Sequence, residues 1–135
     1  MELQVGVKIL LKNKDGKFLV MTRSAEKYPD APHQWEIPGG RINPGTDLQE
    51  NLRREVMEET GLEIKYEPKL ITAQDILREN KNRHIVRLTY TGFADGEVKL
   101  SDEHTEFQWL SLEEISKLEP LDSFLKEVLS KFDLS

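Results

Sequence analysis

The chain has 135 residues, of which 37% are hydrophobic and 33% are charged. This length and balance fit one folded domain over residues 1–135 and exclude a disordered chain. No apolar run approaches the roughly 20 residues that span a bilayer, and the N-terminus lacks the basic region of a signal peptide. We therefore expect a cytoplasmic protein with no membrane partner. The absence of cysteine excludes disulfides and cysteine-based zinc sites.

The formal net charge of the chain is −6. Affinity for phosphate backbones is built mainly from lysine and arginine, so we expect no nucleic-acid partner. A small polyanionic substrate needs a local device that offsets repulsion from such a chain. A metal ion is the obvious device.

In the first third of the chain, the pattern predicts a hairpin. Loose alternation of apolar residues indicates a strand over 4–12, a turn at 13–16 and a returning strand over 17–22. Two prolines mark 24–34 as a loop. Residues 35–37 read as a short extended piece before the bend Pro38-Gly39-Gly40.

A helix is predicted next, over residues 47–60. Its apolar residues Leu48, Leu52 and Val56 recur at a spacing of four and give one buried stripe. Thr46 is the expected N-cap, with Gln49 completing a capping box. Gly61 is placed where a left-handed C-cap is favoured.

The remainder of the chain alternates strands and short helices. Strands are expected at residues 69–77, 85–93, 97–100 and 106–110. A capping box at 111–114 opens a helix that ends near Pro120, and 122–132 forms a final amphipathic helix with its phenylalanines buried. Strands mixed with three helices predict an α/β fold in which helices cover both faces of the sheet.

Three carboxylates lie close together on the predicted helix. Glu55, Glu58 and Glu59 are spaced at i, i+3 and i+4, where like charges destabilise a helix by about 0.2–0.5 kcal/mol per pair. A solvated helix face is the ordinary explanation of such a run. Carboxylates gathered on one helix edge also suit Mg²⁺ or Mn²⁺, which prefer oxygen ligands.

The segment 40–62 resembles the Nudix box, the signature G-x5-E-x7-R-E-U-x-E-E-x-G-U in which U is bulky and apolar. Thr46 replaces the first glutamate of the box. The other eight positions match: Gly40, Arg54, Glu55, Val56, Glu58, Glu59, Gly61 and Leu62. Residues 35–39 and 103–110 extend the resemblance over nearly the whole chain, toward the MutT-like branch of the Nudix hydrolases.

The resemblance implies a Nudix-type α/β/α sandwich with a mixed β-sheet. It also implies a site for Mg²⁺, with Mn²⁺ as a substitute, held by Glu55, Glu58, Glu59 and the carbonyl of Gly39. Glu55 would orient or deprotonate the attacking water. Glu103 is the candidate for a distant general base or a further metal ligand, with Glu106 second.

Arg54 would orient these carboxylates. In the family the first box glutamate pairs with this arginine, and here Asp47 and Glu50 are candidates to replace it.

Substrate contacts are less sharply indicated. Arg23 and Arg41 are candidates for neutralising substrate phosphate, each against the alternative of an ordinary surface arginine. Trp35 either stacks on a base or fills the core, and the core is favoured. The three histidines share no metal-ligand spacing and are expected at the surface or in loops, and Phe107 and Trp109 are expected in the core.

The expected activity is Mg²⁺-dependent hydrolysis of a pyrophosphate bond in a nucleoside-diphosphate-linked substrate. A nucleoside triphosphate, oxidised ones included, would give the monophosphate and pyrophosphate. ADP-ribose or a nucleotide sugar is the alternative substrate, and a non-catalytic Nudix ligand sensor is the alternative class. The partner is then a small nucleotide, and the sequence leaves a homodimer open.

Overall fold

A mixed sheet forms the frame of this computed structural model, which describes residues 1–134. Its seven strands are β1 (Glu2–Lys12), β2 (Phe18–Arg23), β3 (Trp35–Glu36), β4 (Gly39–Arg41), β5 (Lys65–Arg78), β6 (Arg83–Phe93) and β7 (His104–Leu110). The helices are α1 (Leu48–Thr60), α2 (Leu112–Ser116) and α3 (Ser123–Lys131), with a short 3₁₀ turn η1 (Glu79–Lys81). Among the described residues no helix is both long and apolar enough to cross a membrane.

The sheet divides into two wings. In the long wing β1 pairs in parallel with β6 along its whole length, and antiparallel pairs join β6 to β5 and β1 to β4. In the short wing β2 lies between β3 and β7. The two wings share a single register pair between β1 and β2, Lys12 with Phe18, beside the hairpin turn. Beyond that pair the wings diverge, which opens space for a site between them.

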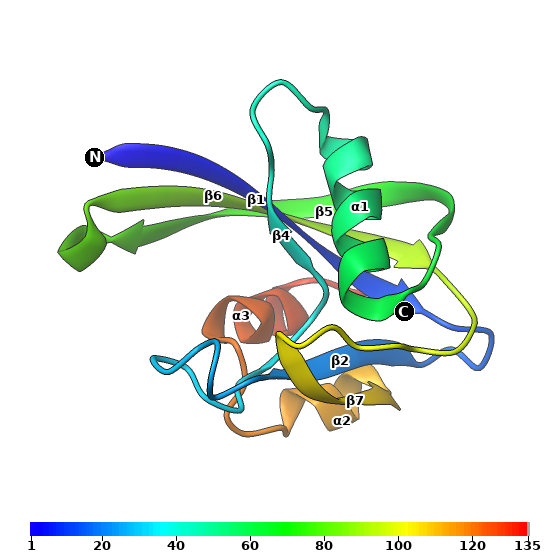
Figure 1. Cartoon of the computed structure of the whole chain (residues 1–135). Coiled ribbons are helices and arrows are strands. Elements are labelled where there is room, and N and C mark those ends of the chain that lie inside the picture. The colour runs from blue at the N-terminus through cyan, green and yellow to red at the C-terminus, as the bar shows by residue number, and fades with distance from the viewer. Residues whose placement is uncertain (135) are drawn as a thin grey trace.

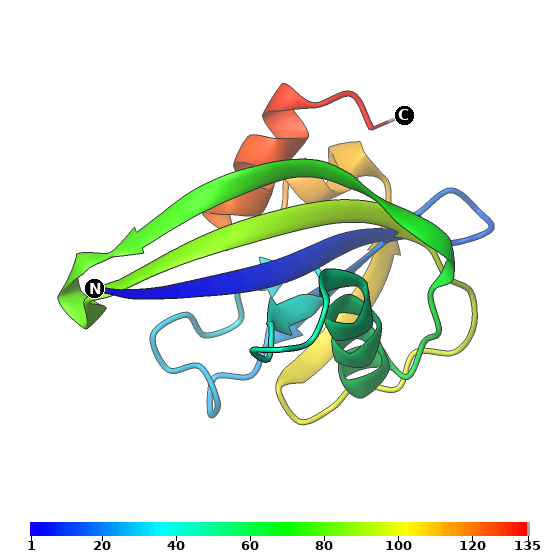
Figure 2. The same ribbon diagram turned by 90° about the horizontal axis from the view of Figure 1, so that it is seen from above.

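Two hydrophobic cores lie on opposite faces of the sheet. One joins Ile9 of β1 to Leu52 of α1, and the other joins Leu10 to Ile115 of α2 and Leu125 of α3. Successive residues of β1 point to opposite faces, as the pleat of a strand requires. Figure 2 shows β1, β6 and β5 side by side, with α1 on one side and α2 and α3 on the other. The expected α/β/α sandwich is confirmed.

Helix α1 begins one residue later than predicted, and its cap is Asp47. The Asp47 carboxylate accepts a hydrogen bond from the backbone N–H of Glu50 at 2.8 Å, and Gly61 ends the helix with φ of 72°. The predicted capping box of Thr46 and Gln49 is therefore wrong. Thr46 is engaged in the preceding turn, where its N–H donates to the carbonyl of Asn43.

The strand predicted at 97–100 is also wrong. This segment runs along the end of α1, where Lys99 N–H donates to the carbonyl of Thr60 at 2.8 Å and Ser101 N–H to that of Glu59 at 3.2 Å. Carbonyls in the last turn of a helix have no partner within the helix, so they take these donors instead of a sheet. The contact ties the loop before β7 to the C-terminal turn of α1.

Two aromatic residues predicted in the core lie at the surface. Phe107 of β7 is 39% exposed, and Phe132, which follows the end of α3, is 37% exposed. Trp109 packs against the first core, as predicted.

We expect Asp47→Ala to lower the free energy of unfolding by about 1 kcal/mol, because it removes the cap of α1. Thr46→Ala is the matched control and should cost less than about 0.5 kcal/mol. Urea denaturation followed by circular dichroism measures both. A larger loss of stability for Thr46→Ala than for Asp47→Ala would indicate that Thr46 is the N-cap after all.

Candidate functional site

A cavity of about 880 Å³ is lined by residues of both wings of the sheet. Its wall includes residues of β1, β4, α1, β5 and β6, together with the segments before β7 and α3. The carboxylates Glu55, Glu59 and Glu103 line one part of it, and arginines that include Arg41 and Arg83 line another. The cavity therefore has an acidic and a basic region although the chain as a whole is acidic.

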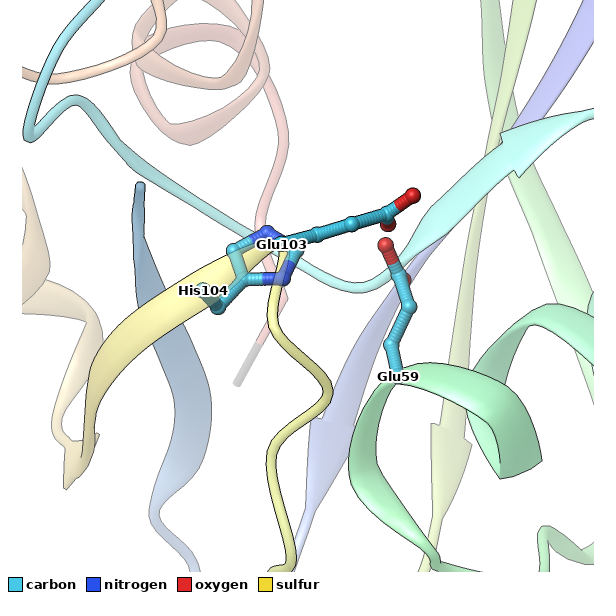
Figure 3. A group of neighbouring side chains, drawn as sticks. All are labelled: Glu59, Glu103 and His104. Carbon is cyan, nitrogen blue, oxygen red and sulfur yellow. The ribbon is translucent and has the colours of Figure 1, made fainter. Parts of the chain in front are cut away.

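The acidic region brings together residues that lie far apart in the sequence. Ligand atoms of Glu59, Glu103 and His104 all lie within 4.8 Å of one another. Glu59 rises from the last turn of α1, and Glu103 reaches from the residue before β7, so that their carboxylates point toward each other (Figure 3). Two facing carboxylates repel each other unless a cation or a proton lies between them.

Glu59 is fixed by the backbone of Gly39. Its carboxylate accepts a hydrogen bond from Gly39 N–H at 2.8 Å, and only 4% of the residue is exposed. Burial raises the pKa of Glu59 to about 7. Gly39 has φ of 145°, and a Cβ at this position would lie 1.9 Å from the carbonyl oxygen of Val7. Only glycine allows β4 to approach β1 closely enough to hold this carboxylate.

A second buried carboxylate, Glu36, lies next to the acidic region of the cavity. It contacts Lys8 Nζ at 3.2 Å, Arg23 Nη2 at 2.9 Å and His104 Nε2 at 2.8 Å. Burial by itself would raise its pKa, but the charge of Lys8 and the hydrogen bonds from His104 and Arg23 hold the pKa of Glu36 well below its usual range.

Because Glu36 is ionised, the hydrogen of this bond resides on Nε2 of His104. His104 Nδ1 is buried and has no hydrogen-bond partner among the described residues. A ring nitrogen of His104 lies within 4.8 Å of carboxylate oxygens of Glu59 and Glu103. The two carboxylates fit a divalent cation such as Mg²⁺ or Mn²⁺, which prefer oxygen ligands.

Arg54 has a different partner from the one predicted. It donates to Glu55 at 3.0 Å, to Glu58 at 3.4 Å and to the side-chain oxygen of Asn51 at 3.0 Å. Neither candidate for replacing the missing box glutamate, Asp47 or Glu50, is among these partners. Asn51 is fully buried and also accepts from the N–H of Asn43, so its amide joins the helix to the preceding loop.

The three helix carboxylates of the motif have different surroundings. Glu55 lines the cavity beside Gly40, where a Cβ would lie 2.5 Å from Glu55 Oε2, and burial raises the pKa of Glu55. Glu59 lines the cavity as well. The side chain of Glu58 is 60% exposed and is not part of the cavity wall. Its role as a metal ligand stays a prediction.

The remaining candidate site residues also divide into those that line the cavity and those that do not. Arg23 and Arg41 line the cavity, whereas Trp35 is buried in the second core and does not. The core alternative for Trp35 is the one that its position favours. Glu106 is exposed on β7 and lies outside the cavity wall. His104 was expected at the surface and is only 4% exposed, so that expectation is wrong.

We expect Glu36→Gln to lower the free energy of unfolding by about 3 kcal/mol or more, because Lys8 and Arg23 lose their buried counter-charge. Urea denaturation measures the loss, with the exposed Glu97→Gln as control. The Glu36 contribution is present above the unfolded glutamate pKa of about 4.3 and is lost as pH falls through the lower folded value. A gap between wild type and variant that widens in acid would contradict this assignment.

Comparisons with known proteins agree with this geometry. The model of the NUDIX domain family matches residues 2–132. The crystal structure of a MutT protein from Methanosarcina mazei Go1 superposes with a TM-score of 0.85 and 32% identity, covering 97% of this chain and 93% of that one.

Two curated relatives are similar in sequence. The nucleoside triphosphatase NudI of Escherichia coli K12 is 30% identical over 115 residues, which cover 78% of this chain and 80% of that protein. The asymmetrical bis(5'-nucleosyl)-tetraphosphatase of Rattus norvegicus is 33% identical over 96 residues, or 66% of this chain. The match spans 63% of the rat protein's length. With the family match over nearly the whole chain, the protein belongs to the Nudix domain family.

Proposed function

We propose that this protein is a Mg²⁺-dependent hydrolase that cleaves a pyrophosphate bond of a nucleoside-diphosphate-linked substrate. The leading substrate is a nucleoside triphosphate, oxidised ones included, which gives the monophosphate and pyrophosphate. The observation that carries the proposal is the buried Glu59 facing Glu103 across the acidic region of the cavity. The name of the related E. coli nucleoside triphosphatase supports the same substrate class.

The carboxylates of the acidic region fit a divalent cation. Glu59 and Glu103 would hold it, with Glu55, Glu58 and the carbonyl of Gly39 as further predicted ligands. When bound, such an ion neutralises the bridging phosphates and lowers the pKa of water at the site. Oxygen ligands favour Mg²⁺ and Mn²⁺ over softer metals.

The protein's own groups position the reacting parts. Gly39 N–H fixes the orientation of the Glu59 carboxylate, and Arg54 fixes that of Glu55. Burial raises the pKa of Glu55, so its carboxylate accepts a proton from the attacking water more readily than an exposed glutamate does. Arg23 and Arg41 in the cavity wall balance the charge of the phosphate chain.

Two other substrate classes can be tested in the same hydrolysis assay. A dinucleoside tetraphosphate is a second candidate substrate, since the name of the rat relative specifies one. ADP-ribose and nucleotide sugars are third. A non-catalytic ligand sensor is disfavoured because a binding module has no need of two facing carboxylates, one of them buried.

We expect hydrolysis of a nucleotide panel to require Mg²⁺ or Mn²⁺ and to stop in EDTA. From a nucleoside triphosphate the products should be the monophosphate and pyrophosphate, separated by anion-exchange chromatography. Undiminished turnover in EDTA would exclude the metal mechanism. Diphosphate and orthophosphate as the products would exclude the proposed bond.

Glu59→Gln should lower kcat/KM at least about 100-fold, because metal assistance is worth several kcal/mol. The exposed Glu63→Gln, just beyond α1, makes the same change outside the cavity and should stay within about twofold of wild type. Steady-state rates with saturating Mg²⁺ measure both variants, and circular dichroism checks their folding. Equal rates for the two variants would remove Glu59 from the site.

A further inference from the structure

The basic region of the cavity, away from Glu55, Glu59 and Glu103, is not explained by hydrolysis alone. We define the distal cluster as the five cations that line it: Arg41, Arg78, Lys81, Arg83 and Arg87. They come from β4, β5, η1 and β6. A chain of net charge −6 has gathered them in one cavity, so the concentration of positive charge is local.

The strand register fixes how far this cluster extends. Lys8 of β1, beside Glu36, is paired with Gly39 of β4 at the acidic region. Two residues back along β1, Gly6 pairs with both Arg41 and Arg87, and six residues back Glu2 pairs with Arg83. At the rise of a strand these steps are about 7 Å and about 20 Å. The far part lies where the N-terminus and the β5–β6 hairpin project together beyond the helices (Figures 1 and 2).

An apolar step lies between the strand level of Arg87 and that of the Arg78–Arg83 pair. Ile76 and Ile85 are cross-strand partners between the two levels, and both line the cavity. Gly6 beside them has no side chain, and the atom nearest to a Cβ built there would be the carbonyl oxygen of Gly40 at 3.7 Å. This part of the cavity wall is therefore apolar and has no projecting side chain at Gly6. Such a surface suits a base or a sugar and disfavours a polyphosphate.

Two of the five cations have acidic partners that also line the cavity. Arg87 binds the buried Asp122 at 2.9 Å, and Lys81 lies 3.7 Å from Asp30.

The other three cations, Arg41, Arg78 and Arg83, are less completely neutralised. Arg78 lies directly opposite Arg83 in the antiparallel pair, a position where like charges destabilise a sheet. Arg83 reaches the exposed Glu2 at 3.9 Å, and its Nε is buried with no hydrogen-bond partner among the described residues.

Arg41 starts at the near level, but its side chain extends toward the far pair and donates to the neutral amide of Gln4, the cross-strand partner of Ile85. Burial, followed by the positive charge of Arg83, lowers the pKa of Arg41. An anion between these arginines would relieve the repulsion.

We propose that Arg41, Arg78 and Arg83 bind a second phosphate, carried on the ribose of the nucleotide whose pyrophosphate lies at the carboxylates. The inference rests on the proposed function for that orientation. The substrate class is then a nucleoside-diphosphate derivative with a 2'- or 3'-phosphate. Guanidinium groups match phosphate oxygens in paired hydrogen bonds. The nucleoside lies over Ile76 and Ile85, and a longer polyphosphate would have to cross that apolar step.

The test measures binding without turnover. Isothermal titration calorimetry in EDTA compares adenosine 5'-monophosphate with adenosine 3',5'-bisphosphate and adenosine 2',5'-bisphosphate. The base is common to all three, so its contribution cancels. At least one bisphosphate should bind about tenfold more tightly, the gain expected from charge-assisted hydrogen bonds. ADP also carries two phosphates, but both are attached at the 5' position of the ribose. Its affinity should therefore exceed that of the monophosphate by less than about tenfold.

Variants locate the gain. The double variant R78Q/R83Q should bring the ratio of bisphosphate to monophosphate affinity close to one. Lys69→Gln, which removes an exposed cation of the same strand β5 outside the cavity, should leave the ratio unchanged. Which bisphosphate gains identifies the 2'- or 3'-position.

A wild-type ratio near one, undetectable binding of both bisphosphates, or a gain retained in R78Q/R83Q would overturn the inference. The binding result and the result of the hydrolysis assay can be distinguished from each other. A preserved gain in a protein that hydrolyses no nucleotide rejects the proposed function and keeps the subsite. Hydrolysis without any gain rejects the subsite and keeps the function.

Discussion

The buried carboxylate of Glu36 is the interaction on which the arrangement of the two wings depends. From β3 it reaches Lys8 of β1, Arg23 of β2 and His104 of β7, so one side chain joins both wings of the sheet. The wings share only one register pair between β1 and β2, and an ionic connection at this depth sets their separation. Because His104 follows Glu103 directly, the same network also sets where Glu103 meets Glu59.

A close backbone contact completes the acidic region. Gly39 brings β4 against β1 and directs its N–H at Glu59, which keeps a buried carboxylate at a defined orientation. Burial raises the pKa of Glu59, so holding this group in place costs stability. Sites that accept such a cost are commonly functional, because a bound cation removes it. The opposite charge of the distal cluster gives the cavity a direction along which an extended nucleotide can lie.

Local patterns predicted much of the fold, and long-range contacts supplied what they missed. The period of Leu48, Leu52 and Val56 predicted α1, since one apolar stripe is enough to define a helix. The choice of Asp47 over Thr46 as its cap depends on a turn that the spacing does not reveal.

The same limit applies to the site. Asn51 carried no signal as the partner of Arg54, because an amide within a helix matches no motif position. Glu36 and His104 are 68 residues apart, and the pairing of β2 with both β3 and β7 brings them together.

The most direct test of the account is anomalous diffraction from a Mn²⁺-soaked crystal. We expect one ion within about 2.0–2.2 Å of oxygens of both Glu59 and Glu103, the range for hard divalent cations. An ordered ion bound elsewhere, with these two carboxylates free of metal, would contradict it.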